Sequence, residues 1–345
     1  MEDQAPDNWR WHSRRVILVD GTEIHLPDTQ ANQAAYPQSR QQQPGLGFPS
    51  LRLVVLMAFA TGVLLDAADG PCQGKESGET ALLRALLDSL RPGDVVVADR
   101  YYCSYWMIAM LRERGVDVAA RLHQLRPCNF NRGQRLGAGD VLQVWARPQR
   151  PTWMDEATYE RMPETLTIRL VRVVVNNPGY RSEMLVVATT LVDAQTYSSA
   201  DIGDLYHRRW HVELDIRSIK QTMGMEELSC KTPAMARKEL WTYLLAYNTV
   251  RRLLAAAALE TGRQPRQLSM AGALQTLETF RSELQGRDLG NAASEALVRV
   301  VLRLVGSHLV GERPGRVEPR RTKRRQQKYP LLRQPRAEAR AALLE

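Results

Sequence analysis

The segment YHRRWHVELDIRSIK, residues 206–220, places carboxylates among several cations at a regular spacing. Four of its side chains follow one another at intervals of three, four and seven residues: Tyr206, Arg209, Glu213 and Lys220. On a continuous helix of about 100° per residue, these four side chains fall within about 80° of one another. The spacing therefore predicts a helix that presents one carboxylate and several basic groups to a common site.

The same spacing is also typical of a surface helix with ion pairs, because Glu213 lies four residues from both Arg209 and Arg217. Two further acids favour a functional site. Asp20 and Asp99 each follow a short apolar run, RVILV and DVVVA, that is expected to form a buried strand ending in the acid. Strand ends of an α/β sheet present ligand groups, and an acid there is costly unless a cation binds it.

Three carboxylates held close together, those of Asp20, Asp99 and Glu213, would repel one another, and a divalent cation relieves that repulsion. Two such ions roughly 3.5–4 Å apart can activate a water and stabilise the leaving oxygen of an in-line phosphodiester displacement. Ligands that are all oxygen atoms favour Mg²⁺ or Mn²⁺ over zinc. These residues therefore predict metal-dependent chemistry on a polynucleotide.

The elements that position these acids alternate in type over the first 128 residues. The expected order is β-β-β-α-β-α-β, with a long loop over residues 26–49, and it predicts a mixed α/β sheet flanked by helices. The first strand is expected to stop at Asp20-Gly21. The remaining strands are expected on both sides of Thr61-Gly62 within 50–70, at 94–100 and at 116–124, and the helices at 75–91 and 101–115.

Beyond residue 128 the hydrophobic period changes to two and then back to a helical one. Strands are expected at 141–146, 166–175 and 183–192, with NNPGYRS at 176–182 as a turn. This is a β-rich insertion. From Ser199 onward helices are expected through 206–220, 241–260 and 269–284.

Composition and charge narrow the class of protein. With 345 residues and 44% hydrophobic content, the chain can bury a sizeable core, and it has neither a long apolar run nor a secretory signal, so a cytoplasmic protein without a membrane span is expected. Residues 313–336 hold ten Lys or Arg against one acid, an excess equal to the whole net charge of +9. This basic, Pro-rich tail is expected to be flexible and to neutralise phosphates.

The spacing Tyr206-x2-Arg209-x3-Glu213-x6-Lys220 matches, without a gap, the Y-x2-R-x3-E-x6-K signature of the IS4-type DDE transposases, which the chain resembles. The stretches VDGTEIHLPDTQANQAAYPQ around Asp20 and VVVADRYYCSYW around Asp99 resemble the two other acidic blocks of that family. The similarity runs from about Arg15 to Arg251, interrupted by the insertion. It implies an RNase H-like core with a β-rich insertion between the second Asp and the Glu.

The resemblance also implies roles for the individual residues. Asp20, Asp99 and Glu213 would be the catalytic ligands of two Mg²⁺ ions, for which Mn²⁺ can substitute. DNA binding would fall to three others: Arg209 and Lys220 through phosphates, and Tyr206 by a hydrogen bond or stacking. The implied activity is cleavage at the inverted-repeat ends of a transposable element and strand transfer into target DNA, the cut-and-paste route. The implied partners are those DNAs and a second copy of the chain, a homodimer in a synaptic complex, in the prokaryotic cytoplasm at the nucleoid.

Family members usually carry a DNA-binding domain before the first Asp, whereas here Asp20 follows only nineteen residues. A catalytic core without that module is therefore expected. Two other functions stay open at this point. One is a catalytically inactive, transposase-derived DNA-binding protein, and the other is an RNase H-like nuclease without strand transfer.

The expected organisation has six parts. A short N-terminal segment covers 1–14. The RNase H-like core occupies 15–128 and 199–260, on both sides of the β-rich insertion at 129–198. A helical C-terminal region at 261–311 and the basic tail at 312–345 complete the chain.

Overall fold

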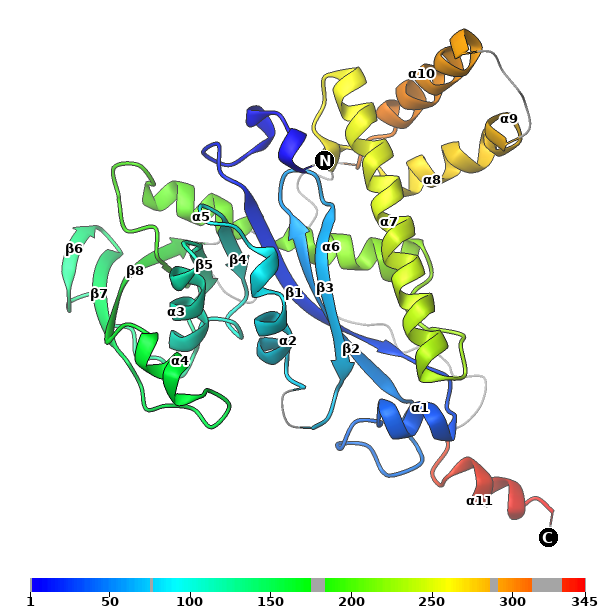
Figure 1. Ribbon diagram of the computed structural model, residues 1–345, viewed down its shortest axis with the longest axis horizontal. Helices are drawn as coiled ribbons and strands as arrows, with labels where there is room; N and C mark the ends of the chain where they lie inside the picture. The colour runs from blue at the N-terminus through cyan, green and yellow to red at the C-terminus, as the bar shows by residue number, and fades with distance from the viewer. Residues whose placement is uncertain (1, 75–76, 175–183, 286–290, 312–330, 345) are drawn as a thin grey trace.

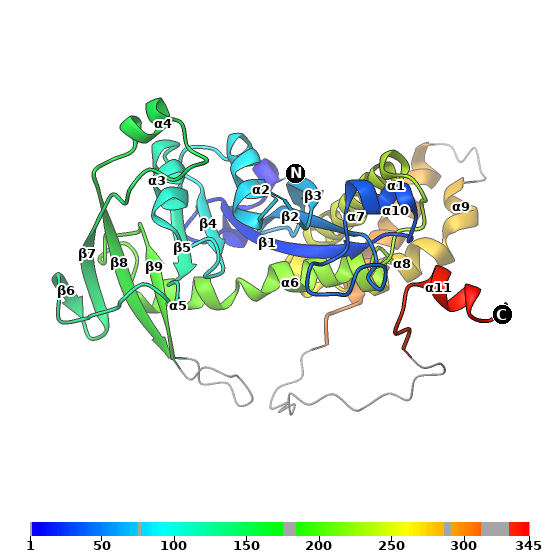
Figure 2. The same ribbon diagram turned by 90° about the horizontal axis from the view of Figure 1, so that it is seen from below.

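The computed structural model describes residues 2–74, 77–174, 184–285, 291–311 and 331–344 (Figure 1). In these residues nine strands form one continuous sheet, in the order β3-β2-β1-β4-β5-β9-β8-β7-β6. Helices lie on both sides of it: α2 and α3 on one face, α5 and α6 on the other (Figure 2). The predicted fold class, a mixed α/β sheet flanked by helices with an RNase H-like core, is confirmed.

The first five strands form the RNase H-like half of the sheet. β2 pairs antiparallel with both β1 and β3, whereas β4 lies parallel to both β1 and β5. The bounds are β1 (Val16–His25), β2 (Ser50–Ala58), β3 (Leu64–Pro71), β4 (Val95–Ala98) and β5 (Asp117–Arg121). With α2 between β3 and β4 and α3 between β4 and β5, this is the predicted order β-β-β-α-β-α-β.

The first strand does not stop at Asp20-Gly21, and that expectation is wrong. β1 continues for five more residues to His25, because the backbone from Asp20 onward pairs with Ser50–Val55 of β2. The pairing with β4 does end early, at Leu18 opposite Val97. Asp20 thus lies within a strand, at the point where its neighbour on one side has ended.

The strands of the insertion extend the same sheet. They are β6 (Gln134–Gly137), β7 (Asp140–Ala146), β8 (Thr165–Val174) and β9 (Met184–Thr189). β9 pairs antiparallel with β5, so the sheet runs without interruption from the core into the insertion. The boundaries expected at 128 and 198 fall between elements, but the division into domains stays a prediction.

A buried ion pair ties the insertion to the segment that leads into α5. Arg169 of β8 is fully buried and donates two hydrogen bonds to Asp140 of β7, at 2.8 and 2.5 Å. Its third nitrogen donates to the carbonyl oxygens of Leu191 and Tyr197. Because a buried cation is tolerated only with its polar groups satisfied, this pair fixes the chain just before α5 (Ser199–His207).

Alternating residues of the central strands face two separate cores. Val16, Leu18 and Val97 belong to the core under α5, α6 and the long helix α7. Ile17 and Val96 belong to the core under α2 and α3. This period of two decides the face to which each functional side chain of the sheet points.

Several predicted elements differ in extent. The loop over 26–49 contains a short helix, α1 (Gln30–Ala35), whose first turn is capped by the Thr29 hydroxyl. The helix expected at 75–91 is α2 (Glu79–Ala85) followed by a 3-10 turn at Leu87–Ser89. α3 (Tyr105–Glu113) is also shorter than expected, because the Ser104 hydroxyl caps it four residues after Arg100. The short helix α4 (Glu156–Arg161) lies within the insertion.

The C-terminal region is helical, as predicted. It follows the long helix α7 (Pro233–Thr261) of the core and contains α8 (Met270–Thr279), α9 (Arg281–Gln285) and α10 (Asn291–Ser307), with α11 (Arg336–Ala341) beyond it. The turn expected at 176–182 and residues 312–330 of the basic tail lie outside the described residues. Within the part of the chain that is described, no helix is both long and apolar enough to cross a membrane.

Candidate active site

The pairing register of the sheet sets Asp20 and Asp99 level with each other. Asp20 lies two residues beyond Leu18, and Asp99 lies two residues beyond its partner Val97. Extending this register by two residues places Asp20 and Asp99 at the same end of the parallel pairing, with Asp99 directly after the last residue of β4. Asp20 shares the face of Leu18, which is the face covered by α6.

The helix expected over 206–220 is interrupted, so the uniform helical wheel is wrong. α5 ends at His207 and α6 (Trp210–Arg217) begins after Arg209, with a π-helical turn at Ser218–Thr222 beyond it. Tyr206 therefore ends one helix, Arg209 occupies the junction, and Glu213 lies in the first turn of the next. The four signature residues still gather on one side because the junction turns Arg209 toward both neighbours.

Arg209 lies between two of the three predicted acids. One of its terminal nitrogens donates to Glu213 Oε1 at 2.6 Å, and the other lies 4.0 Å from Asp20 Oδ2. Its guanidinium carbon is 6.0 Å from the centre of the Tyr206 ring. The Arg209 side chain is only 16% exposed, so it neutralises these carboxylates where water screens them little.

The Asp20 carboxylate has few hydrogen-bond donors or cations around it to offset the cost of its partial burial. Burial raises its pKa to about 7, against the hydrogen bond from the Gly21 N–H and the charge of Arg209, and the charges of Glu213 and Asp99 raise the pKa further. The charges of the other two predicted acids thus both act on Asp20. A partly buried carboxylate that lies near two other acids, with the Gly21 N–H as its hydrogen-bond donor and one arginine 4.0 Å away, fits a divalent cation.

The remaining predicted residues take different positions. Asp99 accepts a hydrogen bond from the Tyr101 N–H at 2.7 Å. Lys220 reaches β1 beyond Asp20, where its Nζ donates to the Glu23 carbonyl oxygen at 2.9 Å. Tyr206 is 7% exposed, and burial raises its pKa to about 12, so its hydroxyl is a neutral group.

The structure does not bring Asp99 into direct contact with the other two acids. Among the described residues, no three His, Cys, Asp or Glu side chains are grouped closely enough to hold a metal ion. Arg209 stands between Asp20 and Glu213 instead. The assignment of these residues as metal ligands therefore stays a prediction.

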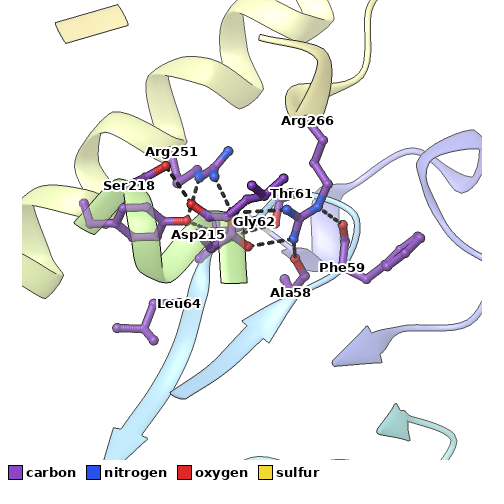
Figure 3. A network of polar contacts seen from close by, with 12 residues as sticks. Ala58, Phe59, Thr61, Gly62, Leu64, Asp215, Ser218, Arg251 and Arg266 are labelled. Carbon is purple, nitrogen blue, oxygen red and sulfur yellow. Dashed lines mark hydrogen bonds and ion pairs between the residues drawn. The ribbon is translucent and has the colours of Figure 1, made fainter. Parts of the chain in front are cut away.

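A buried ionic network fixes α6, and with it Glu213 (Figure 3). Asp215, two residues after Glu213, is 1% exposed and accepts hydrogen bonds from Arg251 of α7 at 2.5 Å and from Arg266 at 3.0 and 3.2 Å. Arg266 also donates to the carbonyl oxygens of Ala58 and Phe59 at the end of β2.

The same network reaches the turn between β2 and β3. Arg251 donates to the Tyr247 hydroxyl at 2.8 Å, and that hydroxyl donates to the Gly62 carbonyl oxygen at 2.7 Å. Gly62 has a positive φ of 72°, and a Cβ there would lie 2.8 Å from the Arg251 guanidinium carbon. The network thus locks α6 against α7 and the sheet and sets the direction in which Glu213 points.

Comparison with known proteins identifies the family. The family described as "Transposase DDE domain" matches residues 11–249, which include every residue of the site. The chain belongs to this transposase family. It is an enzyme of the class that cleaves DNA and transfers strands, DNA is its partner, and the family generally uses divalent metal ions.

Two curated relatives of the transposase come from Escherichia coli (strain K12). The transposase InsG for insertion sequence element IS4 is 28% identical over 326 residues, covering 93% of this chain and 70% of InsG. The putative transposase InsZ is 24% identical over 108 residues, covering 31% of this chain and 35% of InsZ. The predicted IS4-type DDE family is confirmed.

Among solved structures, a piggyBac transposase synaptic complex with hairpin DNA has a similar shape. Its TM-score is 0.43 and its sequence identity 10%, covering 87% of this chain and 58% of the piggyBac chain. The identification of the transposase rests on the family match and not on this structure.

Sequence reasoning missed several residues of the transposase site. Arg121 ends β5, and its positive charge acts on Tyr206. Its position at the carboxyl end of a parallel strand could have indicated from the sequence that Arg121 lies near the site. Asp215 looked like one more exposed helix acid, because its arginine partners are 36 and 51 residues away in the chain. No motif or spacing in the sequence pointed to Glu79 and Tyr102, which are hydrogen-bonded to each other.

Replacing Asp20 by Asn should change how the stability of the transposase depends on pH. The Asp20 pKa is about 7 in the folded chain against an ordinary 3.8, so the folded state binds the proton more tightly. The stability contributed by this proton is complete below about pH 4 and is lost as the pH rises through 7. The loss is on the order of 4 kcal/mol.

Urea unfolding in EDTA at about pH 4.5 and about pH 8 measures this effect. Wild type should lose stability relative to Asp20→Asn at the higher pH. Asp88→Asn, which alters a carboxylate that is 94% exposed, serves as the control and should run parallel to wild type. An equal difference between wild type and Asp20→Asn at both pH values would contradict the shifted pKa.

Replacing Asp215 by Ala should destabilise the fold strongly. Removing one partner of a buried ion pair costs about 3–5 kcal/mol, and here two arginines lose their acceptor. Glu260→Ala removes the partner of Arg303, which is 70% exposed, and should cost no more than about 1 kcal/mol. Similar unfolding midpoints in urea for the two variants would show that the network does not hold α6.

Proposed function

We propose that this transposase cleaves DNA at the ends of a transposable element and joins the freed 3′ ends to target DNA, the cut-and-paste route. Asp20, Asp99 and Glu213 are its catalytic residues. The observation that supports this best is the partly buried Asp20 carboxyl, which the charges of Asp99 and Glu213 both affect and which a single arginine bridges to Glu213. Carboxylates held near one another lower the stability of the fold by mutual repulsion, and a doubly charged cation would remove that repulsion.

The three acids would hold two Mg²⁺ ions, and Mn²⁺ can replace them. When bound by these residues, the ions would supply an activated water and would stabilise the leaving oxygen of the displacement. Glu213 lies on α6, which packs against the strand that carries Asp20, so substrate would approach at the point where Arg209 lies between the two acids. The Asp215 network keeps Glu213 at this position while the scissile phosphate is aligned.

The basic residues of the signature bind the DNA backbone. Arg209 is the counter-ion of Asp20 and Glu213 while no metal ion is bound to them. Once a metal ion is bound, the Arg209 guanidinium turns to a DNA phosphate. Lys220, whose Nζ now donates to the Glu23 carbonyl oxygen, lies along the same strand and follows the backbone beyond the reacting phosphate. Tyr206 packs beside Arg209 and contacts the end of the duplex.

The DNA partners are the inverted-repeat ends of the element and the target duplex. Two copies of the chain would hold both ends in a synaptic complex, a homodimer. The transposase would act in the bacterial cytoplasm, at the nucleoid, where its substrate lies.

Two assays test this function. The first follows Mn²⁺-dependent nicking of supercoiled plasmid, and the second follows the joining of pre-cleaved inverted-repeat ends with a free 3′-OH to a target duplex. Asp20→Asn, Asp99→Asn and Glu213→Gln should each lower both activities at least about a thousandfold, while binding to labelled duplex in Ca²⁺ persists. Lys220→Ala and Arg209→Ala should weaken that binding instead.

Asp204→Asn is the matched control, because Asp204 is an exposed acid of α5 near the site and pairs with Arg208. It should cut and join like wild type. Cleavage that survives in any of the three acid variants would overturn the assignment. Nicking without joining would reveal a plain nuclease, and binding without either activity would reveal a DNA-binding protein.

A further inference from the structure

Two residues that the proposed reaction does not use lie directly behind the acids, on the opposite face of the sheet. Glu79 is the first residue of α2, and Tyr102 follows Asp99 by three residues. The Tyr102 hydroxyl donates to Glu79 Oε2 at 3.1 Å. Tyr102 is 2% exposed and belongs to the core under α2 and α3.

The Glu79 side chain approaches β1 at Gly21, where the strand has no side chain. Gly21 points to the α2 face, because Asp20 points to the α6 face. A Cβ on Gly21 would lie 2.5 Å from Cδ of Glu79 and 2.8 Å from its Cγ and Oε1. The Glu79 carboxyl therefore fills the space that a side chain at position 21 would take, in contact with the backbone next to Asp20.

Tyr102 is built into the turn that carries Asp99. Within this turn the Tyr101 N–H donates to Asp99 Oδ1 at 2.7 Å, and the Cys103 N–H donates to the Arg100 carbonyl oxygen at 3.2 Å. The Tyr102 ring anchors the turn in the core. The hydrogen bond from Tyr102 thus joins the turn of Asp99 to Glu79 of α2, whose carboxyl packs against Gly21 beside Asp20.

This link lies beyond the last backbone pairing between β1 and β4. The pairing of β1 with β4 ends at Leu18 and Val97, two residues before the acids. Beyond that point no backbone pair between the two strands fixes the distance between Asp20 and Asp99. The bond from Tyr102 to Glu79 is a side-chain bridge across this open end of the ladder.

We infer that Glu79 and Tyr102 are positioning residues that hold Asp20 and Asp99 at the spacing needed to share metal ions. The inference rests on the proposed function of these acids. Placing a carboxylate here costs free energy, because burial raises the Glu79 pKa and the nearby charge of Asp99 raises it further. An apolar side chain would fill the same space without that cost. Groups that orient metal ligands from behind typically change metal affinity or activity about 10–100-fold when removed.

Tyr102→Phe tests the inference, and the chain offers a matched control. Tyr105, three residues further along, is also 2% exposed, and its hydroxyl donates to the Pro163 carbonyl oxygen at 2.5 Å, away from the acids. Both substitutions remove one buried, hydrogen-bonded oxygen and leave the ring in place, so both variants should fold and lose a similar amount of stability by the same mechanism.

The first readout is the affinity of the free protein for Mn²⁺, measured by titration calorimetry, with thermal unfolding alongside. Tyr102→Phe should bind Mn²⁺ at least about tenfold more weakly than wild type, whereas Tyr105→Phe should bind it like wild type. Glu79→Ala should match Tyr102→Phe, and Glu79→Gln should recover most of the affinity because its amide oxygen still accepts the Tyr102 hydroxyl. Plasmid nicking should follow the same order.

Equal Mn²⁺ affinity in Tyr102→Phe and Tyr105→Phe would overturn the inference and leave only a structural role. The variants Asp20→Asn and Glu213→Gln separate this outcome from a failure of the proposed function. If these two variants lose Mn²⁺ binding while Tyr102→Phe retains it, only the inference fails. If they bind Mn²⁺ like wild type, the acids are not the metal ligands and both proposals fail.

Discussion

The constraint on which the rest of this structure depends is the electrostatic repulsion that acts on Asp20. This partly buried carboxylate lies within a central strand, and the charges of Glu213 on α6 and of Asp99 both act on it. One arginine offsets this repulsion, and burial still keeps the Asp20 pKa near 7. The stability of the rest of the chain is what makes such a site tolerable.

That stability comes from ion pairs placed on both sides of the site. Arg169 with Asp140 secures the insertion strands to the chain before α5, and Arg251 and Arg266 with Asp215 secure α6 to α7 and the sheet. Arg169 and Arg266 also donate to backbone carbonyl oxygens, and Arg251 donates to the Tyr247 hydroxyl. Asp20, one of the acids proposed to be catalytic, has one hydrogen-bond donor and an arginine 4.0 Å away, whereas Asp140 and Asp215 each accept at least two hydrogen bonds from arginine.

The continuous sheet explains how a β-rich insertion can sit between the second Asp and the Glu without separating them. β9 returns beside β5, so the chain leaves the core at one edge and re-enters it at the same edge. α5 then starts next to the strands it left, with a capping box at Ser198 and Asp201. Glu213 consequently arrives over Asp20 although nearly two hundred residues separate them.

The sequence by itself determined the family, the order of strands and helices in the core, and the acids and basic residues of the signature, because these follow from residue type and short-range period. It misjudged the end of β1 and the continuity of the 206–220 helix, since strand ends depend on partner pairing and helix breaks on packing. Only the tertiary structure decided that Arg209 bridges Asp20 and Glu213, that Asp215 anchors α6, and that Glu79 reaches past Gly21 to Tyr102. These are contacts between residues distant in the chain, and their energies depend on burial, which no local pattern encodes.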